Sequence, residues 1–170
     1  MLNSLKDDNA RLSLLGSYLE NIKGTVFRQT QFAEFELRIH EMVENGEPLT
    51  GDVLNQLYLD ITKKYYGHNQ NVCIVDDEVQ AEWMFIPHFY YNFYVYQYAT
   101  GISAALALSR QIINEGQPAI ERYLRFLRSG SSRSSIDLLR DAGVDMTSPE
   151  PIQAAMDTFA GLVDQLEQLA

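Results

Sequence analysis

Apolar residues recur at intervals of three and four along most of this 170-residue chain, which is the spacing that one face of an α-helix requires. Between residues 9 and 22 the pattern is formed by Leu12, Leu15, Leu19 and Ile22. The stretch 68–82 is rich in Asn and Asp, and it predicts a loop. Similar apolar spacing predicts further helices over residues 26–45, 50–66, 87–116, 118–127, 136–142 and 149–169.

Capping residues and short connections support this division into helices. Thr50 stands directly before an apolar run and is expected to cap it, as is Ser134 or Ser135 further along. The polar stretch 129–135 is too short to be a linker between domains. We therefore predict an all-α fold, a helical bundle of about six or seven helices, in a single domain over residues 1–170.

Composition and charge exclude several classes of partner. The apolar fraction of 46% is that of a folded protein with a core. A net charge of -10 opposes binding to nucleic acid and to anionic membranes. No apolar run reaches about 18 residues, and charges such as Lys6 and Asp7 interrupt any signal-like segment after Met1. We expect a cytoplasmic protein with no nucleic-acid and no membrane partner.

Two groups of residues resemble metal sites but lack the spacing that such sites need. A zinc peptidase helix carries two histidines four residues apart, with a glutamate after the first, in the pattern H-E-x-x-H. Here His40 and Glu41 are followed by Glu44 in place of the second histidine, and we interpret this segment as a solvated helix face. His68 and Cys73 lie five residues apart in the predicted loop and match no common ligand spacing. We assign no metal ligand to this chain.

The segment from Ile86 to Gly101 is unusually aromatic, because positions 88–98 contain five tyrosines, two phenylalanines and a histidine. Taken as a helix with about 100° per residue, it predicts one side that presents imidazole and phenol groups, with Val95 among them. The residues on that side are His88, Tyr91, Tyr94 and Tyr98.

This aromatic side has two interpretations. In the first, the helix is buried on most sides and its tyrosine hydroxyls bond to backbone or water, since aromatic stripes are usually core. In the second, the phenols and the imidazole face a cleft, where they bond the carbonyls of a peptide. They also donate there to the oxyanion that forms when water attacks an amide.

Five segments of the chain resemble the oligoendopeptidase F family of the thimet oligopeptidase superfamily. The resemblance is strongest in the aromatic segment, and the matches follow in order over nearly all of the chain. The segments are Phe27–Glu36 (FRQTQFAEFE), Gly46–Thr50 (GEPLT), Tyr65–Gly67 (YYG), Ile86–Gly101 (IPHFYYNFYVYQYATG) and Leu138–Met146 (LLRDAGVDM).

The resemblance implies a fold and a reaction. The family has a mostly helical ellipsoid with a deep channel, and it hydrolyses short peptides with a zinc ion. The zinc is bound by the two histidines of H-E-x-x-H and by a further glutamate, all of which would lie before Met1. This chain is therefore expected to be the C-terminal part of such a peptidase, without a cofactor of its own and without peptidase activity alone.

The resemblance also implies roles for individual residues. His88 matches the histidine with which the family contacts substrate, and Tyr91, Tyr94 and Tyr98 are further candidates for substrate binding. Tyr98 is expected to stabilise the oxyanion, and Tyr91 is the second catalytic candidate. The expected partners are a short peptide and the N-terminal part of the peptidase.

Two other interpretations remain open. The chain could be a non-catalytic helical domain that binds peptides or other partners and has kept only the channel wall. It could also be a purely structural helical domain, in which case the hydroxyls of Tyr91 and Tyr98 are buried and bonded internally. A domain separated from a larger enzyme exposes apolar surface, which a homo-oligomer is able to cover.

Overall fold

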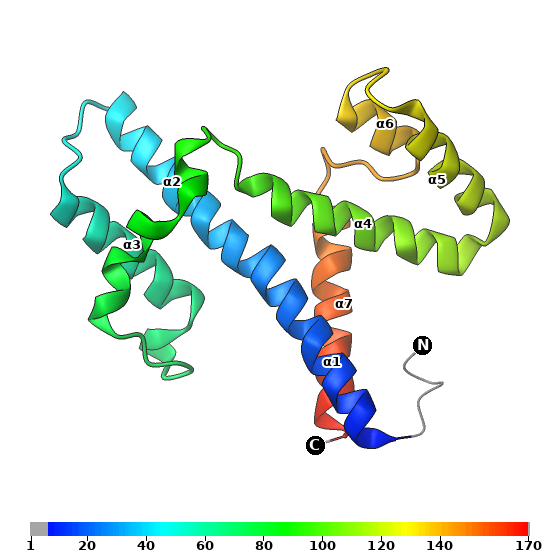
Figure 1. The fold of residues 1–170 in the computed structure, drawn as a ribbon, viewed down its shortest axis with the longest axis horizontal. Helices are drawn as coiled ribbons and strands as arrows, with labels where there is room; N and C mark the ends of the chain where they lie inside the picture. The colour runs from blue at the N-terminus through cyan, green and yellow to red at the C-terminus, as the bar shows by residue number, and fades with distance from the viewer. Residues whose placement is uncertain (1–6, 170) are drawn as a thin grey trace. The chain divides into compact units, whose positions relative to one another are not determined.

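The computed structural model describes residues 7–169, and within that range it consists of helices and connecting turns, without strands. The prediction of an all-α fold with six or seven helices is confirmed (Figure 1). The α-helices are α1 (Asp8–Ile22), α2 (Arg28–Glu44), α3 (Gly51–Tyr65), α4 (Tyr96–Glu115), α5 (Gln117–Ser129), α6 (Ser135–Asp141) and α7 (Glu150–Glu167).

Four shorter helical turns complete the chain. The π-helical turn η2 (Lys23–Phe27) lies between α1 and α2, and three 3₁₀ segments lie between α3 and α4. Part of the predicted loop 68–82 is therefore ordered as 3₁₀ turns. The three segments are η3 (His68–Gln70), η4 (Asp77–Phe85) and η5 (Pro87–Tyr90).

Helix starts follow the polar residues that the sequence places there. The Thr50 hydroxyl accepts a hydrogen bond from the backbone N–H of Val53 at 3.3 Å, and the Ser134 hydroxyl accepts one from Asp137 N–H at 3.2 Å. Each bond satisfies one of the backbone donors that the first turn of a helix leaves without a partner. Both predicted N-caps are confirmed.

The chain forms two compact units. One is Phe27–Ala99, and the other takes in the described residues up to Val26 and those from Thr100 onward. We call them the inner unit and the outer unit, only after their order along the sequence. The chain passes between them within η2 and within α4. The prediction of a single domain over 1–170 stays a prediction.

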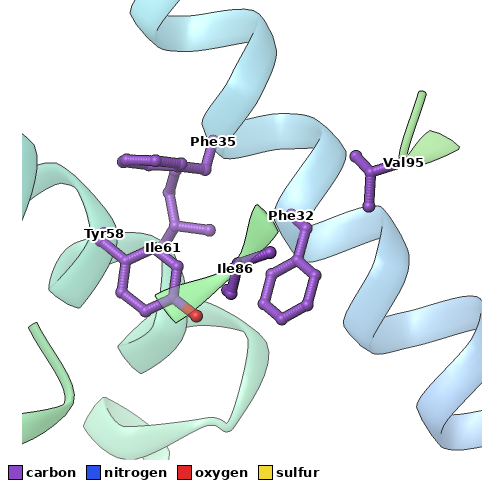
Figure 2. Packing of buried hydrophobic residues seen from close by; sticks show 6 residues of the cluster. All are labelled: Phe32, Phe35, Tyr58, Ile61, Ile86 and Val95. Carbon is purple, nitrogen blue, oxygen red and sulfur yellow. The ribbon is translucent and has the colours of Figure 1, made fainter. Parts of the chain in front are cut away.

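The core of the inner unit lies between α2 and α3 and extends to the segment before α4. Phe35 and Tyr58 are fully buried, and their rings meet edge to face with centroids 5.2 Å apart. Such aromatic pairs stabilise a core beyond the area that they bury. Figure 2 shows the cluster formed by Phe32, Phe35, Tyr58, Ile61, Ile86 and Val95.

A polar network attaches η4 to this core. The buried Tyr58 hydroxyl donates to Glu82 Oε2 at 2.6 Å, and Arg28 forms an ion pair with the same carboxylate. Trp83 Nε1 donates to Asn55 Oδ1 at 2.8 Å. Burial, reinforced by the Glu82 carboxylate, raises the pKa of Tyr58 far above its ordinary value, so its hydroxyl remains a donor.

The outer unit contains two packed groups of helices. Helix α1 packs against α7, and Leu15 on α1 and Ala155 on α7 are buried. A second group joins α4 to α5 and α6 around the buried residues Ala104, Leu108 and Val144. Both groups bury the apolar faces that the helical spacing predicts.

Asp145 organises the turn that leads into α7. Its carboxylate accepts two hydrogen bonds from the Arg140 guanidinium, at 3.1 and 3.2 Å, and two from the Thr147 hydroxyl and backbone N–H, at 2.6 and 2.9 Å. The Arg140 bonds, followed by those from Thr147, hold the pKa of Asp145 well below its usual range.

Because of the lowered pKa of Asp145, we predict that the folded chain loses stability in acid. A carboxylate with a lowered pKa in the folded state stabilises the fold fully above its unfolded pKa of about 3.9 and progressively less below it. We expect Asp145→Asn to lower the melting temperature at pH 7 and to flatten its decline below about pH 4. Melting curves between pH 7 and pH 3 check this, with Asp157→Asn on α7 as the control. Parallel curves for the wild type and Asp145→Asn would contradict it.

Candidate functional site

The aromatic segment does not form one continuous helix. Residues 87–90 form the 3₁₀ turn η5, residues 91–94 are bends and loop, and α4 begins only at Tyr96. The predicted helix over 87–116 is therefore wrong for its first nine residues. The helical arc that was to group the four aromatic residues does not exist over this stretch.

Two consecutive left-handed residues interrupt the helical path. Asn92 has φ 48° and Phe93 has φ 58°, a conformation that Asn tolerates and that a bulky side chain rarely adopts. One consequence concerns Val95, which was predicted on the same side of the helix as the tyrosines. Its side chain is fully buried in the core cluster with Phe32 (Figure 2).

The structure nevertheless brings all four predicted site residues together. The His88 ring lies 6.2 Å from the ring of Tyr91 and 6.1 Å from that of Tyr94, measured between centroids. The His88 and Tyr98 rings are 5.4 Å apart and nearly perpendicular, and the Tyr94 and Tyr98 rings are 5.6 Å apart. We call His88, Tyr91, Tyr94 and Tyr98 the phenol–imidazole cluster.

Polar contacts fix the position of the Tyr98 hydroxyl. His88 Nε2 lies 3.1 Å from it, and which atom donates depends on the histidine tautomer. A hydrogen bond with Tyr94, followed by desolvation, raises the pKa of Tyr98 above its ordinary value. Tyr98 is therefore a neutral hydroxyl throughout the physiological range, which is the form that donates a hydrogen bond.

The cluster faces solvent in the inner unit. The exposed fraction is 60% for Tyr91, 41% for Tyr94 and 37% for Tyr98. The interpretation as a buried aromatic helix is therefore wrong for this segment. The hydroxyls of Tyr91 and Tyr98 belong to exposed side chains, whereas a purely structural domain was expected to bury them.

Alternate residues anchor the same segment to the core. The Phe89 ring contacts Phe32 and Phe35 of α2, with centroids 5.9 and 5.2 Å away. The Phe93 ring packs on His40 at 4.3 Å, and its backbone N–H donates to Glu36 Oε1 at 2.6 Å. Phe89 thus packs against the core, and Phe93 contacts α2 although 39% of it is exposed. The exposed tyrosines and the half-buried His88 form the cluster.

The two apparent metal sites of the sequence have other roles. His40 packs on Phe93, and Glu41 accepts a hydrogen bond from Arg38 at 2.8 Å. His68 Nδ1 accepts a hydrogen bond from Val75 N–H at 3.0 Å. Within residues 7–169, no group of three or more His, Cys, Asp or Glu side chains could bind a metal ion. Neither of these two groups has the donor set that a zinc site needs.

Sequence reasoning missed two carboxylates that support the site. Glu36 is 1% exposed and contacts the segment directly, and Glu82 ties the preceding η4 to Tyr58 and Arg28. In the sequence, Glu36 follows Phe35 on the apolar face of α2. An acidic residue beside an apolar helix face was the available signal for a buried carboxylate. Such a carboxylate needs a hydrogen-bonding partner, because carboxylates are rarely buried without one.

Comparison with known proteins identifies the family of this chain. The sequence model of peptidase family M3 matches residues 1–158, and thus most of the chain including the whole phenol–imidazole cluster. The chain belongs to peptidase family M3. This M3 chain is 55% identical over 169 residues to Oligopeptidase PepF of Bacillus subtilis (strain 168), a match that covers 99% of the chain and 25% of the relative.

Two further matches cover similar shares of the chain and of the matched protein. Oligoendopeptidase F (plasmid) of Lactococcus lactis subsp. cremoris is 45% identical over 170 residues, with 99% of the M3 chain and 28% of the relative covered. The crystal structure of oligoendopeptidase-F from Enterococcus faecium superposes with a TM-score of 0.94 at 46% identity, over 99% of this chain and 32% of that one. The M3 chain thus spans between a quarter and a third of the proteins that it resembles.

These matches confirm the resemblance to oligoendopeptidase F and its helical fold. No helix among the described residues of the M3 chain is both long and apolar enough to span a membrane.

Proposed function

We propose that this chain is the C-terminal, substrate-binding part of a zinc-dependent oligoendopeptidase that hydrolyses short peptides. The observation that carries the proposal is the exposed phenol–imidazole cluster of His88, Tyr91, Tyr94 and Tyr98. Membership of peptidase family M3 supports a peptide as the ligand. The zinc ion and the residue that activates water belong to sequence outside these 170 residues.

In this proposal Tyr98 is the catalytic donor. Attack of water on a peptide bond places negative charge on the carbonyl oxygen, and a neutral hydroxyl stabilises that charge by donating a hydrogen bond. The raised pKa of Tyr98 favours the donor form, and the contact with His88 limits its orientation. Pre-arranged donors of this kind contribute most when they need no reorganisation during the reaction.

The other three residues bind the peptide. Tyr91 is the most exposed member of the cluster and is the second candidate for direct contact with the reacting amide. The rings of His88 and Tyr94 are nearly parallel, with an interplanar angle of 14°. Phenol and imidazole groups donate to and accept from the carbonyls and amides of an extended peptide.

The isolated chain is proposed to lack peptidase activity, because its three histidines, at positions 40, 68 and 88, never stand four residues apart. It is further proposed to work in the cytoplasm, with the N-terminal part of the peptidase as its partner and with homo-oligomerisation as a second way to cover exposed apolar surface. A peptide-binding domain without catalysis is the alternative, which the exposure of the cluster supports equally.

A chimeric enzyme tests the proposal. This chain would replace the matching quarter of the Bacillus subtilis relative, to which it is 55% identical. We expect the chimera to bind zinc and to cleave an internally quenched short peptide, and we expect the isolated chain not to cleave it. Fluorescence release and metal analysis of both proteins are the measurements. A folded, zinc-loaded chimera without cleavage would argue for the non-catalytic peptide-binding domain.

A further inference from the structure

Glu36 on α2 is buried in the inner unit, with 1% of the residue exposed. Its carboxylate Oε1 accepts the backbone N–H of Phe93 at 2.6 Å. Among residues 7–169 no Lys, Arg or His side chain forms an ion pair with it. A buried carboxylate is costly unless its hydrogen bonds compensate for lost water, so the contact with Phe93 is the feature of this position that needs explaining.

The backbone N–H that donates this hydrogen bond belongs to a turn with unfavourable backbone angles. Phe93 and the preceding Asn92 both have positive φ, 58° and 48°. Two left-handed residues in succession persist only where surrounding contacts impose them, and such strain gathers at functional sites. A hydrogen bond between a backbone N–H and a carboxylate is stronger than one between neutral groups, and it is directed at this turn.

The turn lies inside the phenol–imidazole cluster. His88 and Tyr91 precede it, and Tyr94 and Tyr98 follow it. Because φ at Asn92 and Phe93 sets the direction in which the chain continues, the same turn decides whether Tyr98 meets His88. The Phe93 ring on His40 adds a second contact between this turn and α2.

We infer that Glu36 is a positioning residue of the proposed peptidase site. It holds the left-handed Asn92–Phe93 turn through the Phe93 N–H, and it thereby sets Tyr94 and Tyr98 against His88. This inference rests on the proposed function for its catalytic consequence. Its structural consequence, the meeting of the His88 and Tyr98 rings, is measurable in the 170-residue chain itself.

The test compares three substitutions on α2. Glu36→Met keeps the length of the side chain and removes the acceptor, whereas Glu36→Gln keeps an acceptor oxygen. Glu41→Met removes a half-buried carboxylate that pairs with Arg38 and does not contact the aromatic segment. In NMR spectra of the full chain, Glu36→Met is expected to abolish the proton–proton contacts between the His88 and Tyr98 rings, and the other two variants are expected to keep them.

Activity in the chimera supplies the second readout. Glu36→Met is expected to lower kcat by up to about 10²-fold with a smaller change in KM, since misplacing a catalytic group by about 1 Å has an effect of that order. Glu36→Gln is expected to keep most of the activity. Adding Asn92→Gly to Glu36→Met should recover part of the loss, because glycine adopts positive φ readily, and this recovery would not follow if Glu36 served only the stability of the fold.

The outcomes separate the inference from the proposed function. Ring contacts that survive in Glu36→Met would overturn the positioning role. Lost ring contacts with an unchanged kcat would leave the positioning role standing and would overturn the catalytic role of the cluster.

Discussion

A Tyr98→Phe substitution in the chimeric peptidase is expected to lower kcat by about 10²–10³-fold, which is the usual effect of removing one oxyanion donor. The change deletes the hydroxyl alone and keeps the ring that packs against His88 and Tyr94. KM is expected to change far less than kcat, because the hydrogen bond to the oxyanion exists only after water has attacked. Steady-state kinetics with a quenched peptide measure both constants, and bound zinc is expected to be unchanged.

Tyr90→Phe is the matched control for this substitution. It removes the same atom from the same segment, but Tyr90 is 78% exposed and lies outside the cluster. Its kcat is expected to stay within about twofold of the parent chimera, since surface substitutions away from a site rarely matter. Equal activity of Tyr98→Phe and Tyr90→Phe would remove Tyr98 from the catalytic role.

The helices were predictable because each one carries a local signal. Repeating apolar positions gave the extent of α1 and α3, and Thr50 and Ser134 stand at helix starts where their hydroxyls cap the first turn. These signals depend on neighbours within one or two turns. The fold class therefore followed from the pattern without any knowledge of tertiary contacts.

The path of the aromatic segment was not predictable from such signals. Pro87 suits a helix start, and the residues after it contain no glycine or second proline before Gly101. The left-handed turn at Asn92 and Phe93 depends instead on Glu36, which lies 57 residues before Phe93 in the sequence. Only the folded structure brings that carboxylate to the turn, and tertiary contacts then override local helical preference.

The members of the site were predictable although their geometry was not. Helical periodicity was the reason for grouping His88, Tyr91, Tyr94 and Tyr98. The chain is not α-helical before Tyr96, so this reason does not hold for the first three of them. The same four residues meet because Phe89, Phe93 and Val95 between them attach to α2. In the structure Phe89 and Val95 pack against the core while the tyrosines are exposed, although Val95 was predicted on the tyrosine side. The chemical difference between apolar and phenol side chains thus accounts for much of this arrangement.

A Phe35→Ala substitution is expected to lower the free energy of unfolding of this chain by about 3–5 kcal/mol, which is the usual cost of emptying a buried phenylalanine site. Phe35 is fully buried, and its ring lies 5.2 Å from both Tyr58 and Phe89 and 6.3 Å from Trp83. It therefore joins α2 to α3, η4 and η5 at one point. Urea unfolding followed by Trp83 fluorescence measures the change.

Leu37→Ala is the control on the same helix, because Leu37 is 47% exposed, and its expected effect is within about 0.5 kcal/mol. The free energy of unfolding of a typical domain is only about 5–15 kcal/mol, so the expected loss at Phe35 is a large fraction of it. Phe89 loses one of its two ring contacts with α2 at the same time, and the phenol–imidazole cluster loses part of its anchor. Similar unfolding midpoints for Phe35→Ala and Leu37→Ala would contradict the central place of Phe35 in this core.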